Sequence, residues 1–390
     1  MLTRKTMTLN VGPQHPATHG VLRVEVELDG ETVISAKPII GYLHSGIEKN
    51  MEAKTYTQAI TMTDRMDYLA PMSNNLVYVM AVEKLMGVEV PLRAQYLRVI
   101  MTELTRLNSH LVWLGTHATD IGAMTMLLYA FREREKILQV CEFVSGVRMM
   151  TTYFRIGGLA KDVPEGFDTR VKDIIDTFPA KIDEYEGLLT ENKIWKNRTI
   201  GVGKISAEDA IKSGLSGPML RASGVNWDIR KANPYCSYDK FDFEVPLGKN
   251  GDTYDRYKCR VAEMRQSLRI IRQALEGLPH GSYISKDYKI APPPKMEALK
   301  NMEQLIHHFK FWTEGFSPPQ GDVYHSIESP KGEIGCYIVS DGSNKPYRVH
   351  FRPPSFVNIS ALNKLVKGHM MSDLIAIIGT TDIVLGEVDR

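Results

Sequence analysis

The sequence predicts an α+β fold in which helix dominates: a small antiparallel N-terminal sheet, a central bundle of long helices and a mixed C-terminal module. Three observations predict it. Apolar and polar residues alternate near the N-terminus, apolar residues recur every three or four positions through the middle of the chain, and short strand-like runs return near the end. We expect an N-terminal β module with a histidine loop over residues 1–54, a helical bundle over 55–290 and a mixed α/β module over 291–390.

The N-terminal hairpin is predicted by its pattern and its turn. Residues 21–28 alternate with period two, Asp29-Gly30 suits a tight turn, and residues 32–40 supply the returning strand.

The central helices are predicted by apolar spacing and by helix-end signals, such as Pro91 at a first turn and Gly277 and Pro279 after the last helix. The expected helices cover residues 56–87 with an interruption at Pro71, a segment starting at Pro91, 125–149, 167–189 with a break at Pro179, and 252–275. Long helices with short links favour a bundle.

The C-terminal part is predicted to return to strands after a stiff Pro292-Pro293-Pro294 linker. The expected elements are a short helix near 297–311, strands at 323–328, 333–340 and 347–351, turns at 329–332 and 341–344, and two short helices at the end.

Composition excludes several classes of protein. The 390 residues carry 48 Lys and Arg against 46 Asp and Glu, so the net charge of +2 requires no nucleic-acid partner. The first 20 residues lack the apolar core of a signal peptide, and the longest apolar stretch, residues 111–131, is interrupted by His117 and Asp120. We expect a chain with no spanning helix, either soluble or peripheral on a membrane.

The four cysteines give no metal-binding pattern. Cys141, Cys236, Cys259 and Cys336 stand far apart, and no phosphate-binding glycine motif is present. We expect the thiols to be small buried side chains in a reducing compartment, and we expect this chain alone to hold neither a metal nor an iron–sulfur cluster.

Two histidines, His15 and His19, lie in a glycine- and proline-rich segment over residues 12–20. Their spacing of four would suit a helical metal site, but the prolines exclude a regular helix. A loop that presents an imidazole to a cavity and a histidine that only satisfies loop carbonyls remain equally open.

Asp120 is a second candidate, because a carboxylate in an apolar stretch is costly when buried without a partner. A histidine partner would keep the aspartate charged and raise the imidazole pKa. Asp120 could equally cap the helix that follows it. A third candidate segment, residues 65–68, is expected on a helix.

Eight blocks of the sequence resemble a known family, that of the D subunit of respiratory complex I, which is related to the large subunits of nickel–iron hydrogenases. The blocks that carry the resemblance are MTLNVGPQHP (7–16), GYLH (41–44), RMDY (65–68), FRERE (131–135), RIGG (155–158), LRASG (220–224), IVSDG (338–342) and GEVDR (386–390). They extend over almost the whole chain, so the resemblance implies a hydrogenase-large-subunit-like fold.

The resemblance implies that His19 and Tyr68 approach a quinone headgroup and that Asp120 pairs with the histidine. The chemistry agrees with these roles, because two-electron reduction makes both quinone oxygens basic and imidazole and phenol can each donate a proton. Apolar side chains such as Met62 and Met66 could line the quinone channel or could simply pack in the core.

The same resemblance explains why no metal-binding cysteines are present. Hydrogenase large subunits hold their metals with two pairs of cysteines, and the matching positions here are Asp67, Ala70, Val384 and Glu387. None is a soft thiolate, so the resemblance implies that the metal site is lost and that quinone occupies its place.

The resemblance also implies partners. These are the B subunit with the terminal iron–sulfur cluster, the C subunit and the membrane H subunit, with NADH, FMN and the iron–sulfur clusters on partner subunits and no nucleic acid. The expected location is the cytoplasmic face of the bacterial inner membrane. Two other functions stay open at this stage: a scaffold without a chemical role in the same complex, and an active nickel–iron hydrogenase, which the missing cysteines oppose.

Overall fold

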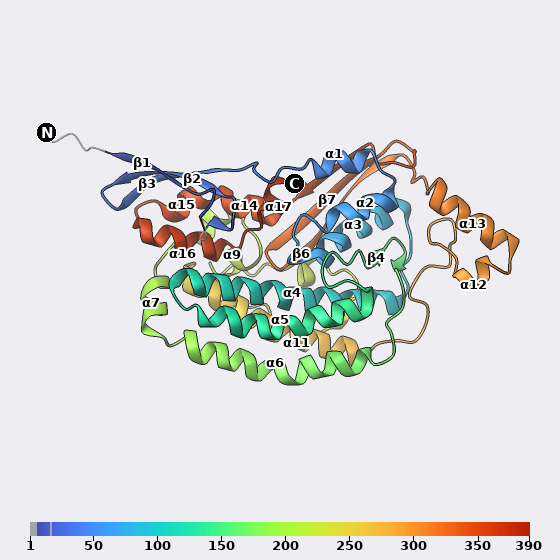
Figure 1. Cartoon of the computed structure of the whole chain (residues 1–390), viewed down its shortest axis with the longest axis horizontal. Coiled ribbons are helices and arrows are strands. Elements are labelled where there is room, and N and C mark those ends of the chain that lie inside the picture. Colours follow the sequence, from blue (N-terminus) through green and yellow to red (C-terminus); the bar gives the residue numbers. More distant parts are fainter. Residues whose placement is uncertain (1–5, 16–17) are drawn as a thin grey trace.

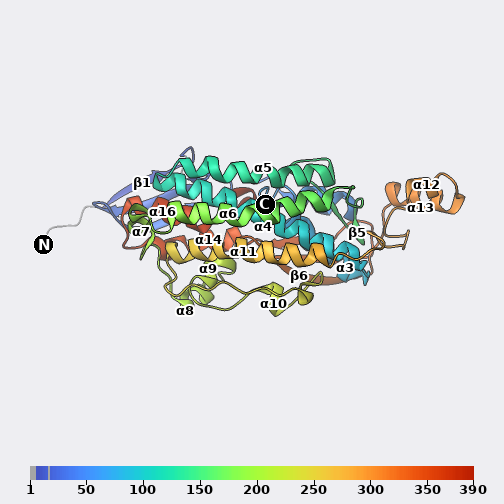
Figure 2. The same ribbon diagram turned by 90° about the horizontal axis from the view of Figure 1, so that it is seen from below.

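A computed structural model of the chain describes residues 6–15 and 18–390, and four long helices form one layer of it (Figure 1). They are α4 (Leu92–Ile121), α5 (Thr125–Ser145), α6 (Phe167–Leu189) and α11 (Thr253–Glu276). Helix α4 packs against α5 and α11, and α6 packs against the same two helices (Figure 2). The predicted central bundle is therefore present. In the described part of the chain, no helix is long and apolar enough to cross a membrane.

Local signals set most helix ends. Pro91 is the N-cap of α4, and α4 and α5 end at Gly122 and Gly146, both in the left-handed conformation that glycine adopts readily. The side chain of Asp252 accepts a hydrogen bond from the Asp255 N–H and caps α11.

Helix α6 differs from the prediction, because it continues through Pro179 without a break. A proline inside a helix removes one hydrogen bond and costs about 3 kcal/mol. Ile175, Phe178 and Ile182 flank Pro179 and are buried. Burying three such side chains contributes roughly 1.5–3 kcal/mol each, which offsets the loss.

The region 56–87 forms two helices, α2 (Tyr56–Thr63) and α3 (Pro71–Met86), with Pro71 in the first turn of α3 as predicted. The seven residues between them, 64–70, form turns, and we name this segment the Tyr68 link. Tyr68 and its neighbours therefore do not lie on a helix, and that part of the prediction is wrong. The Asp67 carboxylate accepts from the Leu69 N–H over 3.1 Å, a local bond that competes with helical bonding.

The N-terminal sheet contains the predicted hairpin, formed by β2 (Arg23–Asp29) and β3 (Thr32–Ile39). A further strand that was not predicted, β1 (Met7–Val11), pairs antiparallel with β2. The buried face of the sheet, including Leu22 and Val24, shares a hydrophobic core with the C-terminal helices. Residues from the two ends of the chain therefore form one core.

The second sheet is the predicted meander of β6 (Gly321–Ser329), β7 (Gly332–Ser340) and β8 (Arg348–Arg352), and it packs on α3. Before it, two short helices, α12 (Lys295–Ala298) and α13 (Met302–Thr313), replace the single predicted helix and project from one end of the molecule (Figures 1 and 2). The N-caps of these two helices are Pro294 and Asn301.

The C-terminal region has four short helices instead of the predicted two: α14 (Pro354–Ser360), α15 (Leu362–Val366), α16 (Met371–Thr381) and α17 (Leu385–Asp389). Asp382 adopts a left-handed conformation that separates α16 from α17. The Asp389 carboxylate accepts from the N–H groups of Gly41 and Leu43 over 2.8 and 2.7 Å, which anchors this end of the chain.

The remaining elements are α1 (Ile47–Glu52), β4 (Phe154–Arg155), β5 (Gly158–Leu159), α7 (Lys193–Thr199), α8 (Ala207–Lys212), α9 (Gly217–Arg221), α10 (Ile229–Ala232) and η2 (Tyr238–Lys240). All four cysteines are buried and unpaired, which confirms their predicted role as small core side chains.

Candidate functional site

The histidine loop connects β1 to β2 and is closed on itself. A Cβ at Gly12 would lie only 2.1 Å from the Leu22 carbonyl oxygen, so the start of the loop packs directly against its end. The Thr18 hydroxyl donates to the His15 carbonyl over 2.7 Å. The described residues of this loop form no regular helix, as the prolines predicted, and they carry His19 toward the interior.

His19 lies in a left-handed backbone conformation, with φ of 51°, and its Nε2 atom is buried without a hydrogen-bond partner in the described structure. Burial and the nearby charge of Lys331 lower the imidazole pKa to about 4, and a hydrogen bond with the Ile383 backbone opposes them. The imidazole is therefore neutral at pH 7, with one nitrogen free to accept a proton.

Tyr68 is held by contacts of the residues on both sides of it. The neighbouring Asp67 is bonded to Lys331, and the carbonyl of Leu69 accepts from the Asn108 side chain over 2.9 Å. The Tyr68 side chain itself is 41% exposed, so its phenol is accessible while the link behind it is buried. Partial burial and the charge of Asp67 raise the Tyr68 pKa, and the charge of Lys331 lowers it.

Lys331 is a candidate site residue that the sequence did not reveal. It lies at the tip of the β6–β7 hairpin, where a lysine in a Ser-Pro-Lys-Gly turn is usually exposed, yet its side chain is fully buried. Its ammonium donates to Asp67 Oδ2 and to Ser109 Oγ, each over 2.9 Å. The same charge acts on the pKa of both His19 and Tyr68, so Lys331 is electrostatically coupled to both candidate residues.

The hairpin tip is held in place from α4 and α9. The guanidinium of Arg106 donates to the backbone carbonyls of Glu328 and Ser329, over 2.6 and 3.0 Å. Arg221 donates to the Glu328 carboxylate over 2.7 Å. Such charge-assisted bonds are strong in a dry interior, which explains how the turn with Lys331 is fixed inside the protein.

Two further carboxylates act on Lys331: Asp382, between α16 and α17, and Glu387, on α17. Burial alone would lower the ammonium pKa, but Asp382, Asp67 and Glu387 together raise it, so Lys331 stays charged. Two segments resemble the metal-binding motifs of the hydrogenases, one with Asp67 and Ala70 and one with Val384 and Glu387. These two segments thus meet around the ammonium group of Lys331. A Cβ at Gly386 would lie 2.8 Å from the Met66 carbonyl oxygen, which shows how closely they pack.

Asp120 lies in the last turn of α4, at the predicted helix junction, and burial raises its pKa to about 6. It does not cap the next helix, because the N-cap of α5 is Met124. Among the described residues, no hydrogen bond or ion pair joins Asp120 to His19, so their pairing stays a prediction.

The histidine closest to Asp120 along α4 is His117. Asp120 Oδ2 and His117 Nδ1 both approach Gly379 of α16, where a Cβ would lie 3.2 and 2.5 Å from them. His117 is buried, stacks on Trp113, and finds no partner for either ring nitrogen in the described structure. Burial and the charges of Arg260, His19 and Arg256 lower its pKa to about 3.

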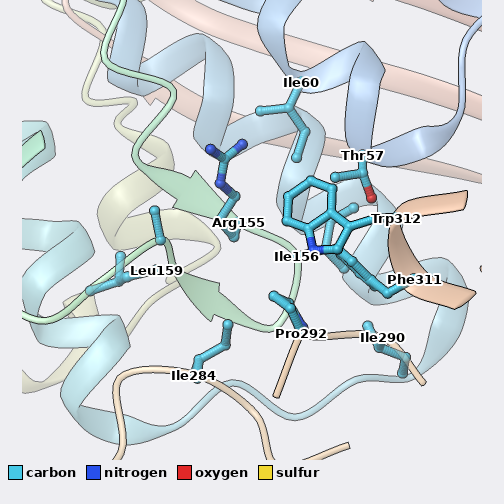
Figure 3. Close-up of a pocket in the computed structure, with 11 residues that line it drawn as sticks. Thr57, Ile60, Arg155, Ile156, Leu159, Ile284, Ile290, Pro292, Phe311 and Trp312 are labelled. Carbon is cyan, nitrogen blue, oxygen red and sulfur yellow. The ribbon is translucent and has the colours of Figure 1, made fainter. Parts of the chain in front are cut away.

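Two other features help to delimit the site. Within residues 6–15 and 18–390, no group of three or more His, Cys, Asp or Glu side chains is arranged to hold a metal ion. An apolar pocket lined by Ile60, Phe311 and Trp312, among others, lies elsewhere and contains none of the predicted site residues (Figure 3). Its volume of about 150 Å³ is below the roughly 300–1,000 Å³ of common small-molecule sites.

Comparison with known proteins identifies the family. Residues 120–390 match the family model described as the 49 Kd subunit of respiratory-chain NADH dehydrogenase. The chain is 62% identical, over the full length of both proteins, to the D subunit of NADH-quinone oxidoreductase from Geotalea uraniireducens. The chain belongs to this family.

Other relatives agree. The chain is 60% identical to one of the D subunits of NADH-quinone oxidoreductase from Chloroflexus aurantiacus, covering 99% of the chain and 95% of the relative, and 59% identical over full length to the D subunit from Geobacter sulfurreducens. The resemblance predicted from the sequence blocks is confirmed. The family and the mixed α/β architecture also fit the expected hydrogenase-large-subunit-like fold. The chain is therefore a subunit of an oxidoreductase complex.

Proposed function

We propose that this chain forms the quinone-reduction site of a proton-pumping NADH:quinone oxidoreductase, with His19 and Tyr68 at the quinone headgroup. The observation that carries the proposal is that the buried ammonium of Lys331 is bonded to Asp67, the neighbour of Tyr68, and that its charge also acts on His19. A site for a ligand with two carbonyl oxygens needs two proton-donating groups under one electrostatic influence, and this pair supplies them.

Tyr68 is the group that can donate a proton before the quinone has been reduced. Its phenol is protonated at pH 7, as an ordinary tyrosine would be, and its raised pKa keeps it so, while the positive charge of Lys331 favours the phenolate that forms when the proton leaves. The Tyr68 ring is exposed and therefore accessible to a ligand. The buried Asp67–Lys331 pair lies behind it and supplies the charge.

His19 has a different role, because its imidazole is neutral before the quinone is reduced. A neutral imidazole with an unpaired nitrogen can take up a proton when negative charge accumulates next to it, because a nearby anion raises the pKa of a histidine. In the proposed function, reduction of the quinone supplies that charge. His19 would therefore gain its proton during reduction and pass it to the second quinone oxygen, and Asp120 would stabilise the imidazolium.

The proposal extends to the assembly around this site. The electrons come from the terminal iron–sulfur cluster of the B subunit, with the C subunit and the membrane H subunit as further neighbours, and NADH, FMN and the remaining clusters on other subunits. The chain would sit at the cytoplasmic face of the bacterial inner membrane, held there by its partners. The full-length match to relatives that are D subunits supports this arrangement.

The test uses membranes that contain the assembled complex with His19→Ala, Tyr68→Phe or the wild-type chain. Electron transfer from NADH to quinone is compared with transfer to an artificial acceptor that takes electrons before the quinone site. We expect both variants to lose quinone reduction at least tenfold and to keep the artificial activity.

Survival of both activities in both variants would favour a scaffold without a chemical role in the complex. Loss of both activities would indicate failed assembly. Because Tyr68→Phe keeps the aromatic ring and lacks only the phenol hydroxyl, measuring the amount of assembled complex in this variant distinguishes a folding defect from a chemical one.

A further inference from the structure

The buried side of the Tyr68 link faces an unusual concentration of charge. Asp67, Asp382 and Glu387 all act on the single ammonium of Lys331, and all four side chains are buried. They come from four separate parts of the chain: the Tyr68 link, the β6–β7 hairpin, the end of α16 and α17. We name these four residues the Lys331 cluster.

The Lys331 cluster contains more carboxyl groups than positive charges. Asp67 accepts directly from the Lys331 ammonium over 2.9 Å. Asp382 has a second cation, because its Oδ2 lies 3.8 Å from the Nε of Arg260. Glu387 forms no ion pair within the described residues. A buried carboxylate without a counter-ion costs several kcal/mol, so this position favours the neutral acid.

The contacts of Glu387 agree with a protonated side chain. Its Oε2 accepts from the backbone N–H of Ser355 over 3.3 Å and from the Ser355 hydroxyl. Its Oε1 is buried and has no partner among the described residues. An unpaired anionic oxygen would be far costlier there than an unpaired hydroxyl, so a proton on Oε1 is the stable arrangement.

From this geometry we infer that Glu387 is the internal proton store that restores the Tyr68 phenol after it has donated to quinone. The inference rests on the proposed function and adds the origin of the tyrosine's next proton. Asp67 provides the connection, because it adjoins Tyr68 in the chain and because the segments of Asp67 and Glu387 pack directly together. A Cβ at Gly386, next to Glu387, would lie 2.8 Å from the carbonyl oxygen of Met66, next to Asp67. The charge of Asp67 also acts on both Tyr68 and Glu387.

Electrons and protons balance in this step. The two electrons come from the partner subunit's iron–sulfur cluster and reduce the quinone, and the Tyr68 O–H bond breaks as its proton forms an O–H bond on one quinone oxygen. The remaining phenolate then receives the proton of the Glu387 carboxyl group, which leaves a carboxylate beside Lys331. The negative charge has moved from the headgroup to the interior, where an ammonium stabilises it.

The titration of Glu387 supports a proton store that works near neutral pH. Burial is the larger cause and the charge of Asp67 the smaller one, and together they raise the pKa of Glu387 to about 8. The hydrogen bonds from Ser355 and the charge of Lys331 oppose this shift. The groups that face it are Asp67 from the Tyr68 link, Lys331 from the hairpin and the uncharged Ser355 from α14. The acid is therefore mostly protonated at pH 7 and can release its proton to a more basic phenolate.

The experiment measures quinone reduction in the assembled complex from about pH 6 to about pH 10 for wild type, Glu387→Gln and Glu387→Asp, with the artificial acceptor as control. In wild type we expect the rate to fall as pH rises through about 8, because the store empties. Glutamine matches the shape but carries no exchangeable acid proton. We expect Glu387→Gln to be at least tenfold slower at pH 7 and to lack this decline, and Glu387→Asp to recover part of the rate.

A spectroscopic readout makes the result independent of rates. Infrared difference spectra of wild-type complex should show loss of a carboxylic acid C=O band as pH is raised through about 8. In Ser355→Ala, which removes a hydroxyl donor from Glu387, the midpoint should move to higher pH. Absence of such a band in wild type, or an unmoved midpoint, would overturn the inference even if Glu387→Gln does not assemble.

The two proposals fail in different ways. If Tyr68→Phe abolishes quinone reduction while Glu387→Gln keeps the wild-type rate and pH profile, the proton store is wrong and the quinone site stands. If Tyr68→Phe reduces quinone normally, the proposed function itself is wrong, and the proton store is overturned with it.

Discussion

The ammonium of Lys331 donates to Asp67 Oδ2 over 2.9 Å, although 264 residues separate the two in the chain. The pair joins the tip of a β-hairpin to the link that carries Tyr68, and both side chains are withdrawn from water. A buried pair of this kind adds little net stability, but losing one partner is costly because a charge is left alone. Its value here is positional, since it places a fixed positive charge behind the candidate headgroup site.

Lys331→Met should destabilise the protein by about 3–5 kcal/mol, because Asp67 becomes an unpaired buried carboxylate. The double variant Lys331→Met/Asp67→Asn should recover a large part of that loss, because Asp67 no longer leaves an unpaired buried carboxylate. Denaturant unfolding of the purified chain measures both, with Lys345→Met, in the exposed turn of the next hairpin, as the matched control. Additive effects of the two substitutions would contradict the pairing.

Gly12→Ala should disrupt the histidine loop far more than Gly20→Ala. Both glycines have positive φ, of 83° and 98°, so either alanine costs about 1–2 kcal/mol for the backbone conformation. Only at Gly12 would the new Cβ also meet a carbonyl oxygen, at 2.1 Å, while Gly20 has open space. We expect Gly12→Ala to reduce quinone reduction at least tenfold and Gly20→Ala to change it little. Equal effects would mean that loop closure does not position His19.

Asp120→Asn tests whether charge at this position couples quinone reduction to proton pumping. Burial raises the Asp120 pKa to about 6, so the carboxylate is ionised at pH 7 and the substitution removes a charge next to His117. We expect the number of protons pumped per quinone reduced to fall by more than the rate of quinone reduction. Simultaneous measurement of both in sealed vesicles gives the ratio, and an unchanged ratio would argue against the coupling role.

His117→Phe should make the protein more resistant to acid. The pKa of His117 is about 3 in the folded state, against 6.5 for an ordinary histidine, so only the unfolded chain takes up this proton as pH falls below about 6.5. His117 therefore contributes to the free energy of unfolding at neutral pH, and this contribution is lost as pH falls from 6.5 toward 3. Phenylalanine can keep the stacking on Trp113 without titrating.

The expected difference is measurable. Between about pH 7 and pH 4, the free energy of unfolding of wild type should fall by roughly 2–3 kcal/mol more than that of His117→Phe. His280→Phe, at an exposed position after α11, is the matched control and should behave like wild type. If His117→Phe loses as much stability in acid as wild type, the imidazole is not kept neutral by burial.

Much of the fold could be predicted because its signals are local. The Asp29-Gly30 turn, the Pro91 and Asp252 helix starts and the glycine helix ends act within a few residues, and the structure contains each of these elements. The family, too, could be recognised from short blocks distributed along the chain, and the relatives confirm it.

The errors have a common cause, which is tertiary packing. Helix α6 continues through Pro179 because its apolar face is buried in the bundle, a stabilisation that local propensity does not include. The Tyr68 link is not helical because the Leu69 carbonyl accepts from the distant Asn108 side chain in place of a helical bond, while Lys331 fixes the neighbouring Asp67 side chain. Strand β1 is an exception, because its five residues, MTLNV, do alternate between apolar and polar, and a strand could have been predicted there from the sequence.

The sequence by itself determined the architecture and the family, because both depend on neighbouring residues or on recognisable blocks, and the resemblance proposed three candidate residues, His19, Tyr68 and Asp120. Only the tertiary structure decided the charges at the site. A lysine in a hairpin turn gives no sign that it is buried, and carboxyl groups at positions 67, 382 and 387 give no sign that they meet. Protonation depends on burial and on the distance between charges, and both are properties of the folded chain.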